Sequence, residues 1–120
     1  MRGLTIIVVT ADPERLHAAF TFAAAAAAGG ASARVHLHET AVALLAGPLT
    51  ATNDEARRRA GLPTLDQIFE EADALGVRIS VCQSGLALAG LTLEGIDPRI
   101  EANGPLGLFG SLGTDQFISF

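Results

Sequence analysis

Hydrophobic residues occur along this chain in short continuous runs, and longer helical patterns separate these runs. Residues 4–9 (LTIIVV) form a mostly β-branched apolar run, which is typical of a strand buried on both faces of a sheet. Asp12 and Pro13 come next, and these residue types favour the N-cap and the first turn of a helix. We expect this helix over residues 13–28, because Gly29 then stops it. A strand followed at once by a helix predicts the opening of a βαβ unit.

The same alternation continues to the end of the chain. Residues 33–39 (ARVHLHE) alternate as a strand does, with apolar side chains on one face and His36 and His38 on the other. The spacing of apolar residues, glycines and prolines predicts the remaining segments in the same way. In chain order these are a short helix over 40–46, an aperiodic mobile loop over 49–63, a helix from the capping box at Thr64 to Gly76, a strand over 77–82, a helix over 83–90, a short helix over 104–112 and a strand over 116–120.

Strands that alternate with helices predict the α/β class. We expect a small flavodoxin-like three-layer sandwich with a mainly parallel sheet of about five strands, formed by residues 1–120 as a single domain. Buried strands are expected over residues 4–9, 35–38, 77–81 and 117–119. The first and third of these should not lie at an edge of the sheet, because continuous apolar runs suit central positions.

Composition adds an expectation of self-association. Hydrophobic residues make up 49% of the chain and charged residues 18%, against a usual charged share of about 25%. The alanine-rich helix over residues 13–28 also has little polar surface of its own, so a monomer would expose apolar area. We therefore expect a homo-oligomer.

Charge and residue types also narrow the function classes. The net charge of -5 argues against a nucleic-acid partner, because little positive charge is present to release counterions from phosphates. The arginines at 57–59 form the one basic run, which suits a solvated loop or the attraction of an anionic substrate. No apolar stretch reaches the roughly 18 residues of a membrane span, so we expect no membrane partner and a cytoplasmic location. One cysteine and three scattered histidines predict no metal site, and the glycines within 104–113 lack the Lys-Ser/Thr of a phosphate loop, so no cofactor is expected.

Chemistry is expected where the parallel strands end, because ligands of open α/β sheets bind beyond the carboxyl ends of the strands. Cys82 is the main candidate for a catalytic residue. It ends a predicted strand and begins a predicted helix, where unpaired N–H groups and the helix dipole stabilise a thiolate. A small buried hydrophobic residue is the alternative interpretation of Cys82, since cysteine is among the most buried residue types.

Three polar residues are expected to line a pocket around this cysteine. They are Thr10, His38 and Ser84, which follow or end three of the predicted strands. His38 can orient the thiol or take its proton, or it can simply bond to backbone groups. His36 is expected to pack under a helix, and His17 to lie at the surface or in an interface. The loop over 49–63 is expected to gate the crevice.

The order of these segments resembles the DsrE/DsrF-like family of sulfur-relay proteins, which includes TusD-like subunits. The resemblance extends from LTIIVV to the closing GPLGLFGSLGTDQFISF, and its most specific parts are GVRISVCQSGLALAGL and DQFISF. It implies that Cys82, at the position of the family's cysteine, accepts sulfane sulfur as a persulfide and passes it to a partner protein. It also implies a trimer or a hexamer. Relay members carry basic residues in the helix after the cysteine, whereas residues 83–91 carry no charge.

Three functional hypotheses follow from these observations. The first is a sulfur carrier or sulfurtransferase in which Cys82 bears the persulfide, with donor and acceptor proteins as partners. The second is a non-catalytic oligomeric module that binds a small anionic ligand at the strand ends, and the third is a purely structural oligomer. A two-cysteine peroxidase cycle within one chain is excluded, because there is no resolving cysteine.

Overall fold

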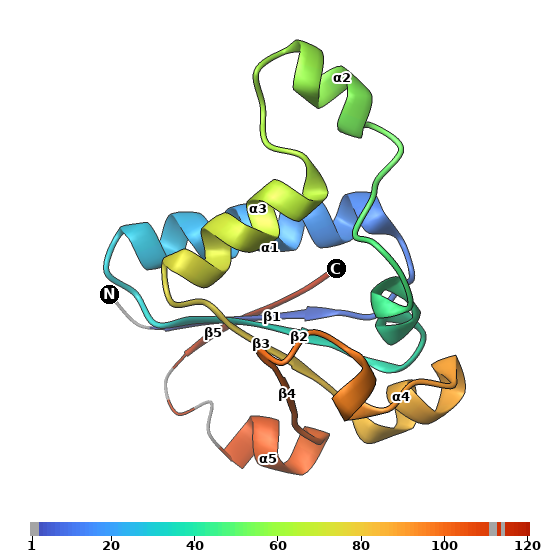
Figure 1. Ribbon diagram of the computed structural model, residues 1–120. Coiled ribbons are helices and arrows are strands. Elements are labelled where there is room, and N and C mark those ends of the chain that lie inside the picture. The colour runs from blue at the N-terminus through green and yellow to red at the C-terminus, as the bar shows by residue number, and fades with distance from the viewer. Residues whose placement is uncertain (1–2, 111–112, 114) are drawn as a thin grey trace.

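The computed structural model describes residues 3–110, 113 and 115–120 (Figure 1). Within these residues, five strands form one sheet in the order β4-β3-β2-β1-β5, and all neighbouring strands are parallel. The strands are β1 (Leu4–Val8), β2 (Ala33–Leu37), β3 (Arg78–Val81), β4 (Ile100–Ala102) and β5 (Gln116–Ser119). The helices are α1 (Pro13–Ala28), α2 (Asp54–Arg59), α3 (Leu65–Ala74), α4 (Gln83–Ala89) and α5 (Pro105–Gly110), with two 3-10 helices, η1 (Glu39–Leu45) and η2 (Leu93–Gly95). Helices lie on both sides of the sheet, so the predicted α/β sandwich is confirmed (Figure 1).

One face of the sheet is covered by α1 and α3, which pack side by side (Figure 1). Their sequence signals act as predicted, because the Asp12 side chain caps α1 and Thr64 and Gln67 form a capping box at the start of α3. Phe20 of α1 meets Phe69 of α3 edge to face, with ring centroids 5.6 Å apart. Together with the apolar side of the inner strands, these helices form the hydrophobic core.

The opposite face has a shorter cover, made by α5 and α4 (Figure 1). Successive side chains of β2 point to opposite faces of the sheet, and this alternation determines which residues lie on the α5 face. Val35 and Leu37 point into the core beneath α1 and α3, whereas His36 lines a cavity beside α5. Polar side chains are therefore concentrated on the α5 face of the sheet, and β2 contributes to both environments.

The two edge strands differ from the sequence-based expectations. β1 and β3 are internal, as predicted, but β5 lies at an edge, where Phe117 is 45% and Ile118 is 41% exposed. The expectation of a buried strand over residues 117–119 is therefore wrong, since an apolar run does not reveal what covers it. The other edge strand, β4, was not located from the sequence, because it has only three residues and contains the charged Glu101.

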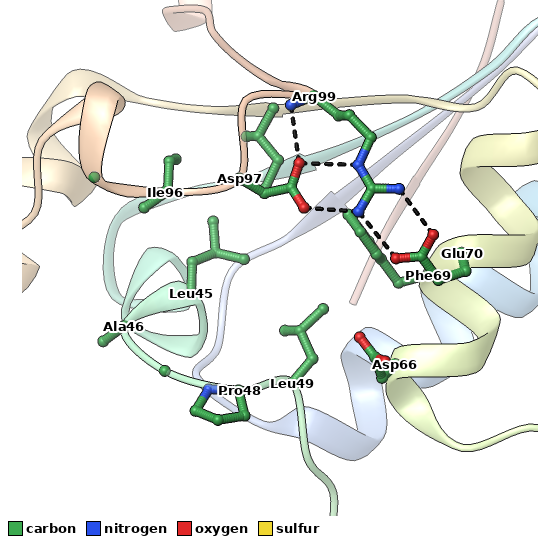
Figure 2. A pocket seen from close by; sticks show the side chains of 13 residues that line it. Leu45, Ala46, Pro48, Leu49, Asp66, Phe69, Glu70, Ile96, Asp97 and Arg99 are labelled. Carbon is green, nitrogen blue, oxygen red and sulfur yellow. Dashed lines mark hydrogen bonds and ion pairs between the residues drawn. The ribbon is translucent and has the colours of Figure 1, made fainter.

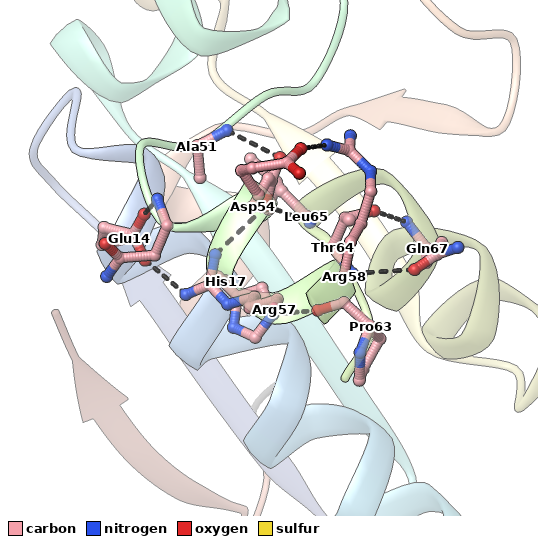
Figure 3. Close-up of polar contacts among 12 residues, drawn as sticks. Glu14, His17, Ala51, Asp54, Arg57, Arg58, Pro63, Thr64, Leu65 and Gln67 are labelled. Carbon is pink, nitrogen blue, oxygen red and sulfur yellow. Dashed lines mark hydrogen bonds and ion pairs between the residues drawn. The ribbon is translucent and has the colours of Figure 1, made fainter. Parts of the chain in front are cut away.

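Residues 49–63 are not the aperiodic loop that the sequence suggested. They contain α2, and the buried Asp54 at its start fixes the segment (Figure 3). The Asp54 carboxylate accepts hydrogen bonds from the backbone N–H groups of Ala51 (2.9 Å) and Leu65 (3.0 Å), and from Arg57 Nη1 (3.1 Å). Burial acts to raise the pKa of Asp54, but these hydrogen bonds outweigh it and hold the pKa below its usual value.

A second set of contacts ties the same segment to α1 (Figure 3). Arg57 forms an ion pair with Glu14, which also accepts a hydrogen bond from the Asn53 N–H (2.9 Å). His17 Nε2 is hydrogen-bonded to the carbonyl oxygen of Pro63 (3.0 Å). Figure 1 shows α2 projecting beyond α1 and α3, away from α4. The expected gate is therefore contradicted, because the segment lies on the other side of the sheet.

The alanine-rich helix also differs from its predicted role. Ala19, Ala23, Ala24 and Ala26 are buried within this chain, so they do not leave the apolar surface from which self-association was inferred. Phe22 of the same helix is 56% exposed, and further exposed apolar side chains occur on α5 and β5, where Phe109 is 58% exposed and stacks on Phe117 with ring centroids 5.9 Å apart. The expectation that these alanines would be exposed in a monomer is therefore wrong, and the homo-oligomer itself stays a prediction.

Two shorter helices have bounds that differ from the predicted ones. The helix expected over 40–46 is the 3-10 helix η1, which begins at Glu39. The helix expected over 104–112 is α5, and residues 111–112 lie outside the described residues.

Candidate functional site

Cys82 lies at the junction of β3 and α4, where the backbone changes from strand to helix. It is the N-cap residue of α4, with an extended backbone (φ -89°, ψ 152°). Its Sγ accepts a hydrogen bond from the Gly85 N–H at 3.3 Å, as an N-cap side chain does. The apolar β3 anchors one side of this junction in the core, so the position of the sulfur is set by a rigid element.

Two further donors converge on the same sulfur. The backbone N–H of Glu39, at the start of η1, donates to Cys82 Sγ at 3.1 Å, and the Ser84 hydroxyl donates at 3.4 Å. The donors come from two segments that are far apart in the sequence and meet at the carboxyl ends of β2 and β3. A neutral thiol is a weak acceptor, whereas a thiolate gains strongly from N–H and O–H donors. Three hydrogen-bond donors therefore converge on one sulfur atom.

Glu39 adopts a backbone conformation that is rare for its residue type. Its φ is 52°, in the left-handed region, which costs of the order of 1–3 kcal/mol for a residue other than glycine. This conformation coincides with the turn that presents the Glu39 N–H to Cys82 Sγ. The Glu39 Oε2 atom is buried and has no hydrogen-bond partner among the described residues. The sequence pattern did not identify Glu39, because a left-handed glutamate leaves no compositional signal.

Gly85 allows α4 and η1 to approach closely. A Cβ atom built at Gly85 would lie 2.3 Å from Val42 Cγ2 and 2.8 Å from the Glu39 carbonyl oxygen. Both distances are far below normal contact, so the absence of a side chain is required here. This close approach brings the Glu39 and Gly85 N–H groups to the same sulfur.

Cys82 is buried, with 2% of its surface exposed. A cavity of about 330 Å³ lies beside it, and Glu39 and Gly85, whose N–H groups contact the sulfur, line this cavity. Its other lining residues are Ala11, Thr40, Ala43, Leu88 and Ala89. The sulfur is thus covered in this conformation, and two of the residues that contact it line the cavity.

The other predicted site residues are not all brought together. Ser84 contacts Cys82 Sγ, as described above, whereas Thr10 lies exposed beyond the end of β1. The His38 ring lines a separate cavity beside α5 and is not among the hydrogen-bond partners of Cys82 Sγ in the described part of the chain. The His38 backbone N–H donates to the Val8 carbonyl at 2.9 Å, which extends the sheet.

Comparison with known proteins agrees with this architecture. The model of the DsrE/DsrF-like family matches residues 4–109. The chain belongs to this family. Among solved structures it is similar to the YchN protein from E. coli, with a TM-score of 0.72 and 20% sequence identity over 98% of this chain and 99% of that chain. At this identity the likeness shows a shared fold. No curated protein matches the chain.

His36 is the second unusual side chain of this DsrE/DsrF-like chain. It is buried, and its Nδ1 is hydrogen-bonded to the Ser80 hydroxyl at 2.7 Å. Burial, followed by the charges of His38 and Arg34, lowers the pKa of His36 from 6.5 to about 4. The imidazole is therefore neutral at physiological pH. Its Nε2 is buried and has no hydrogen-bond partner among the described residues.

A further cavity, of about 370 Å³, lies between α3 and the segment before β4 (Figure 2). Arg99 enters it and forms ion pairs with Glu70 (2.8 Å), Asp73 (3.3 Å) and Asp97 (2.7 Å). The guanidinium carbon also lies 4.7 Å from the centre of the Phe69 ring. The neighbouring carboxylates balance the positive charge of Arg99 and raise its pKa. Its hydrogen-bond donors are already paired with these carboxylates, so Arg99 offers little to an anionic ligand.

Two features are absent from the described residues of this DsrE/DsrF-like chain, namely a cluster of metal-ligating side chains and a membrane-spanning helix. No three His, Cys, Asp or Glu side chains in that part of the chain are grouped so that they could hold a metal ion. None of the helices described there has both the length and the apolar character needed to cross a membrane.

Proposed function

We propose that this protein is a sulfur carrier in which Cys82 holds sulfane sulfur as a persulfide and passes it to a partner. The observation that supports this function is the convergence of three donors, from Glu39, Ser84 and Gly85, on a single sulfur atom. A purely structural cysteine in a core needs no such donors. Membership of the DsrE/DsrF-like family, which is generally linked to sulfur relay, supports the same function.

The chemistry requires only displacement at sulfur. The Cys82 thiolate attacks the outer sulfur of a donor persulfide, forms a new S–S bond and releases the donor as its thiolate. The total number of electrons in the two partners is unchanged, so no oxidant or reductant is consumed. A thiolate of the acceptor then attacks the outer sulfur on Cys82 and regenerates the Cys82 thiolate, which the three donors stabilise.

Access to the sulfur takes place through the cavity beside Glu39 and Gly85. We infer that the Cys82 side chain must move toward this cavity to react, because Cys82 is only 2% exposed in the structure. The cavity would then hold the outer sulfur of the persulfide. Because α4 carries no charged side chain, backbone N–H groups supply the stabilisation that basic side chains provide in the resembling relay proteins.

Donor and acceptor proteins are the expected partners, and a cytoplasmic homo-oligomer, trimer or hexamer, is the expected form. Exposed apolar side chains, such as Phe22 on α1 (56% exposed), support self-association. A net charge of -5 is consistent with partners that are proteins and not nucleic acids.

A second candidate is a non-catalytic oligomeric module that binds a small anionic ligand at the strand ends. The burial of Cys82 at 2% exposure favours this alternative, because a binding module does not need a reachable thiol. The two functions differ in whether the Cys82 sulfur itself becomes covalently modified.

Intact-protein mass spectrometry after incubation with thiosulfate, polysulfide or glutathione persulfide tests the proposal. We expect the wild-type protein to gain one or more sulfur atoms, located on Cys82 by peptide analysis and removed by dithiothreitol. Cys82→Ser should gain none and should keep its fold and its oligomeric state, since serine is nearly isosteric and can still cap α4.

Two hydroxyl deletions provide a graded comparison. Ser84→Ala removes one donor and should slow loading several-fold without abolishing it. Thr21→Ala is the matched control, because it removes an exposed hydroxyl on α1 and should load at the wild-type rate. Failure of every donor to modify folded wild-type protein, with iodoacetamide reacting only after unfolding, would leave the binding module as the better function.

A further inference from the structure

A separate cavity of about 320 Å³ lies on the same face of the sheet, between the sheet and α5. Ile7 and Val9 line it from the β1 side, and Leu108 and Phe109 line it from α5. Phe117 of β5 completes the apolar wall. The volume falls within the range of small-molecule sites, which begins at about 300 Å³.

The lining of this cavity carries no permanent charge. Among the described residues that line it, there is no Asp, Glu, Lys or Arg, and its polar members are His36, His38 and Ser119. Aromatic rings make much of the wall, since Phe109 and Phe117 stack with their ring planes 18° apart. Such a lining suits a neutral, largely apolar molecule and disfavours an anion, whose charge would lose its hydration without an opposite charge nearby.

His36 contributes to this apolar cavity a side chain whose Nε2 has no hydrogen-bond partner among the described residues. Its Nδ1 is held by Ser80 of β3, and the two nitrogens of an imidazole point in widely different directions. This bond leaves the other nitrogen, Nε2, without a partner in the described part of the chain, and the His36 side chain that carries it lines the cavity. A buried polar atom without a partner costs about 1–3 kcal/mol, and a ligand that bonds to it recovers part of this cost.

The topology of the sheet points to the same place. The strand order runs from β1 to β4 in one direction, and β5 returns to the other side of β1. In open α/β sheets, ligands bind near the carboxyl ends of strands where the order reverses. Ile7 of β1 and Phe117 of β5 both line the cavity, whereas Cys82 follows β3, two strands away from β1.

We propose that the cavity beneath α5 binds a neutral aromatic or aliphatic molecule that carries one hydroxyl or similar hydrogen-bonding group, with His36 Nε2 as the partner of that group. This site is independent of the persulfide chemistry of Cys82, because it is lined by different residues and lies beside a different strand junction. Its ligand class is defined by size, by the absence of charge and by one polar contact.

Titration of isotope-labelled protein with naphthol, naphthalene and naphthoate, followed by amide NMR shifts of β1 and α5, tests the proposal. We expect naphthol to bind about tenfold more tightly than naphthalene, as one net hydrogen bond of up to about 1.5 kcal/mol implies. Naphthoate should bind more weakly than naphthol. Cys82→Ser should bind all three as the wild type does, which separates this result from the outcome for sulfur loading.

Variants identify the polar contact. The double variant His36→Phe/Ser80→Ala removes both partners of the buried hydrogen bond and should bind naphthol no better than naphthalene. Phe109→Ala changes a largely exposed side chain, so it should fold normally and weaken both aromatic ligands several-fold. Phe22→Ala deletes an exposed ring that stacks on Phe120 outside the cavity, and it should bind as the wild type does.

Three outcomes would overturn the proposal. One is equal affinity of wild-type protein for naphthol and naphthalene, and another is the absence of saturable shifts in β1 and α5. The third is that the wild-type protein forms an oligomer that the Phe109→Ala substitution dissociates. In this outcome, the naphthalene-based ligands cannot reach β1 and α5 in the wild-type oligomer. In that case a second copy of the chain covers the cavity, and no small ligand occupies it.

Discussion

The two faces of the sheet differ in almost every physical respect. The face beneath α1 and α3 presents buried aliphatic side chains from every inner strand, among them Ile6, Val35 and Ile79. The face toward α4 and α5 presents the buried polar side chains of His36 and Ser80, and Cys82 follows the end of β3. Both faces belong to the same strands, so the difference arises from the alternation of side chains along each strand.

This difference separates stability from chemistry within one sheet. The α1 and α3 face excludes water and fixes the strands, so it holds the opposite face rigid without taking part in ligand contacts. The opposite face can then tolerate two features that cost stability, a His36 nitrogen with no partner in the described part of the chain and a left-handed backbone at Glu39. The features that lower the stability of the fold therefore occur on the face that carries the candidate sites.

Replacing one phenylalanine by alanine on each face should give the largest difference in the free energy of unfolding. Phe20→Ala empties a fully buried site against Phe69 and should lower the free energy of unfolding by about 3–5 kcal/mol. Phe109→Ala, on the other face, should lower it by less than about 1 kcal/mol, because its ring is 58% exposed. Urea denaturation of both variants measures the contrast. Equal losses would show that α5 belongs to the core after all.

Acid should destabilise the protein through His36. Its pKa is about 4 in the folded chain and 6.5 as the ordinary value, so between these pH values the unfolded chain binds more protons than the folded one. This contribution to stability is complete above pH 6.5 and falls as the pH drops toward 4, by up to about 3 kcal/mol.

The variant His36→Gln should flatten the pH dependence of unfolding in that window, as urea denaturation at a series of pH values will reveal. His17→Gln is the control, because it makes the same change at a residue that contacts Pro63 on the other side of the sheet. A slope that His36→Gln leaves unchanged would mean that His36 is not held neutral by its surroundings.

Gly85→Ala should have an intermediate effect, located at the cysteine. The added methyl group collides with Val42 and the Glu39 carbonyl, so α4 must move away from η1. We expect a loss of about 1–3 kcal/mol in the free energy of unfolding, together with slower sulfur loading as the donors separate. Gly47→Ala is the control, because nothing lies within 4 Å of its added Cβ. Full loading by a destabilised Gly85→Ala would disprove the role of this close packing.

Glu39→Gly should have the smallest effect and the opposite sign. Glycine adopts φ 52° freely, so the free energy of unfolding should change by no more than about 1 kcal/mol, in the stabilising direction. The N–H donor to Cys82 Sγ is retained, so sulfur loading should persist. Thermal unfolding and mass spectrometry check the two statements, and a strongly destabilised variant would show that the Glu39 carboxylate has a structural role.

The interior of the fold could be predicted from the sequence because its signals are long and local. Apolar runs located β1 and β3, and caps located α1 and α3, whose helical patterns extend over several turns. β4 has only three residues and α2 follows no apolar period, so both are set by tertiary contacts such as those of Asp54. The exposure of β5 could not be predicted, because the sequence of a strand does not specify its neighbours.

The candidate site was predictable in position but not in composition. The end of a strand and the start of a helix identified Cys82, and the same spacing brought Ser84 to its sulfur. The alternation in β2 correctly set His36 and His38 apart from the core, yet it gave no indication that the His38 ring would turn away from the cysteine. Glu39 depends on one backbone angle, which composition does not encode.

The pairing of β1 with β5 has a consequence for synthesis of the chain. Leu4 pairs with Gln116, so β1 gains its second neighbour only after β5 has been synthesised. Contacts this distant in sequence form slowly, and until then one side of β1 has unpaired backbone groups. Nascent chains stalled before residue 116 should therefore engage chaperones more than chains that contain β5.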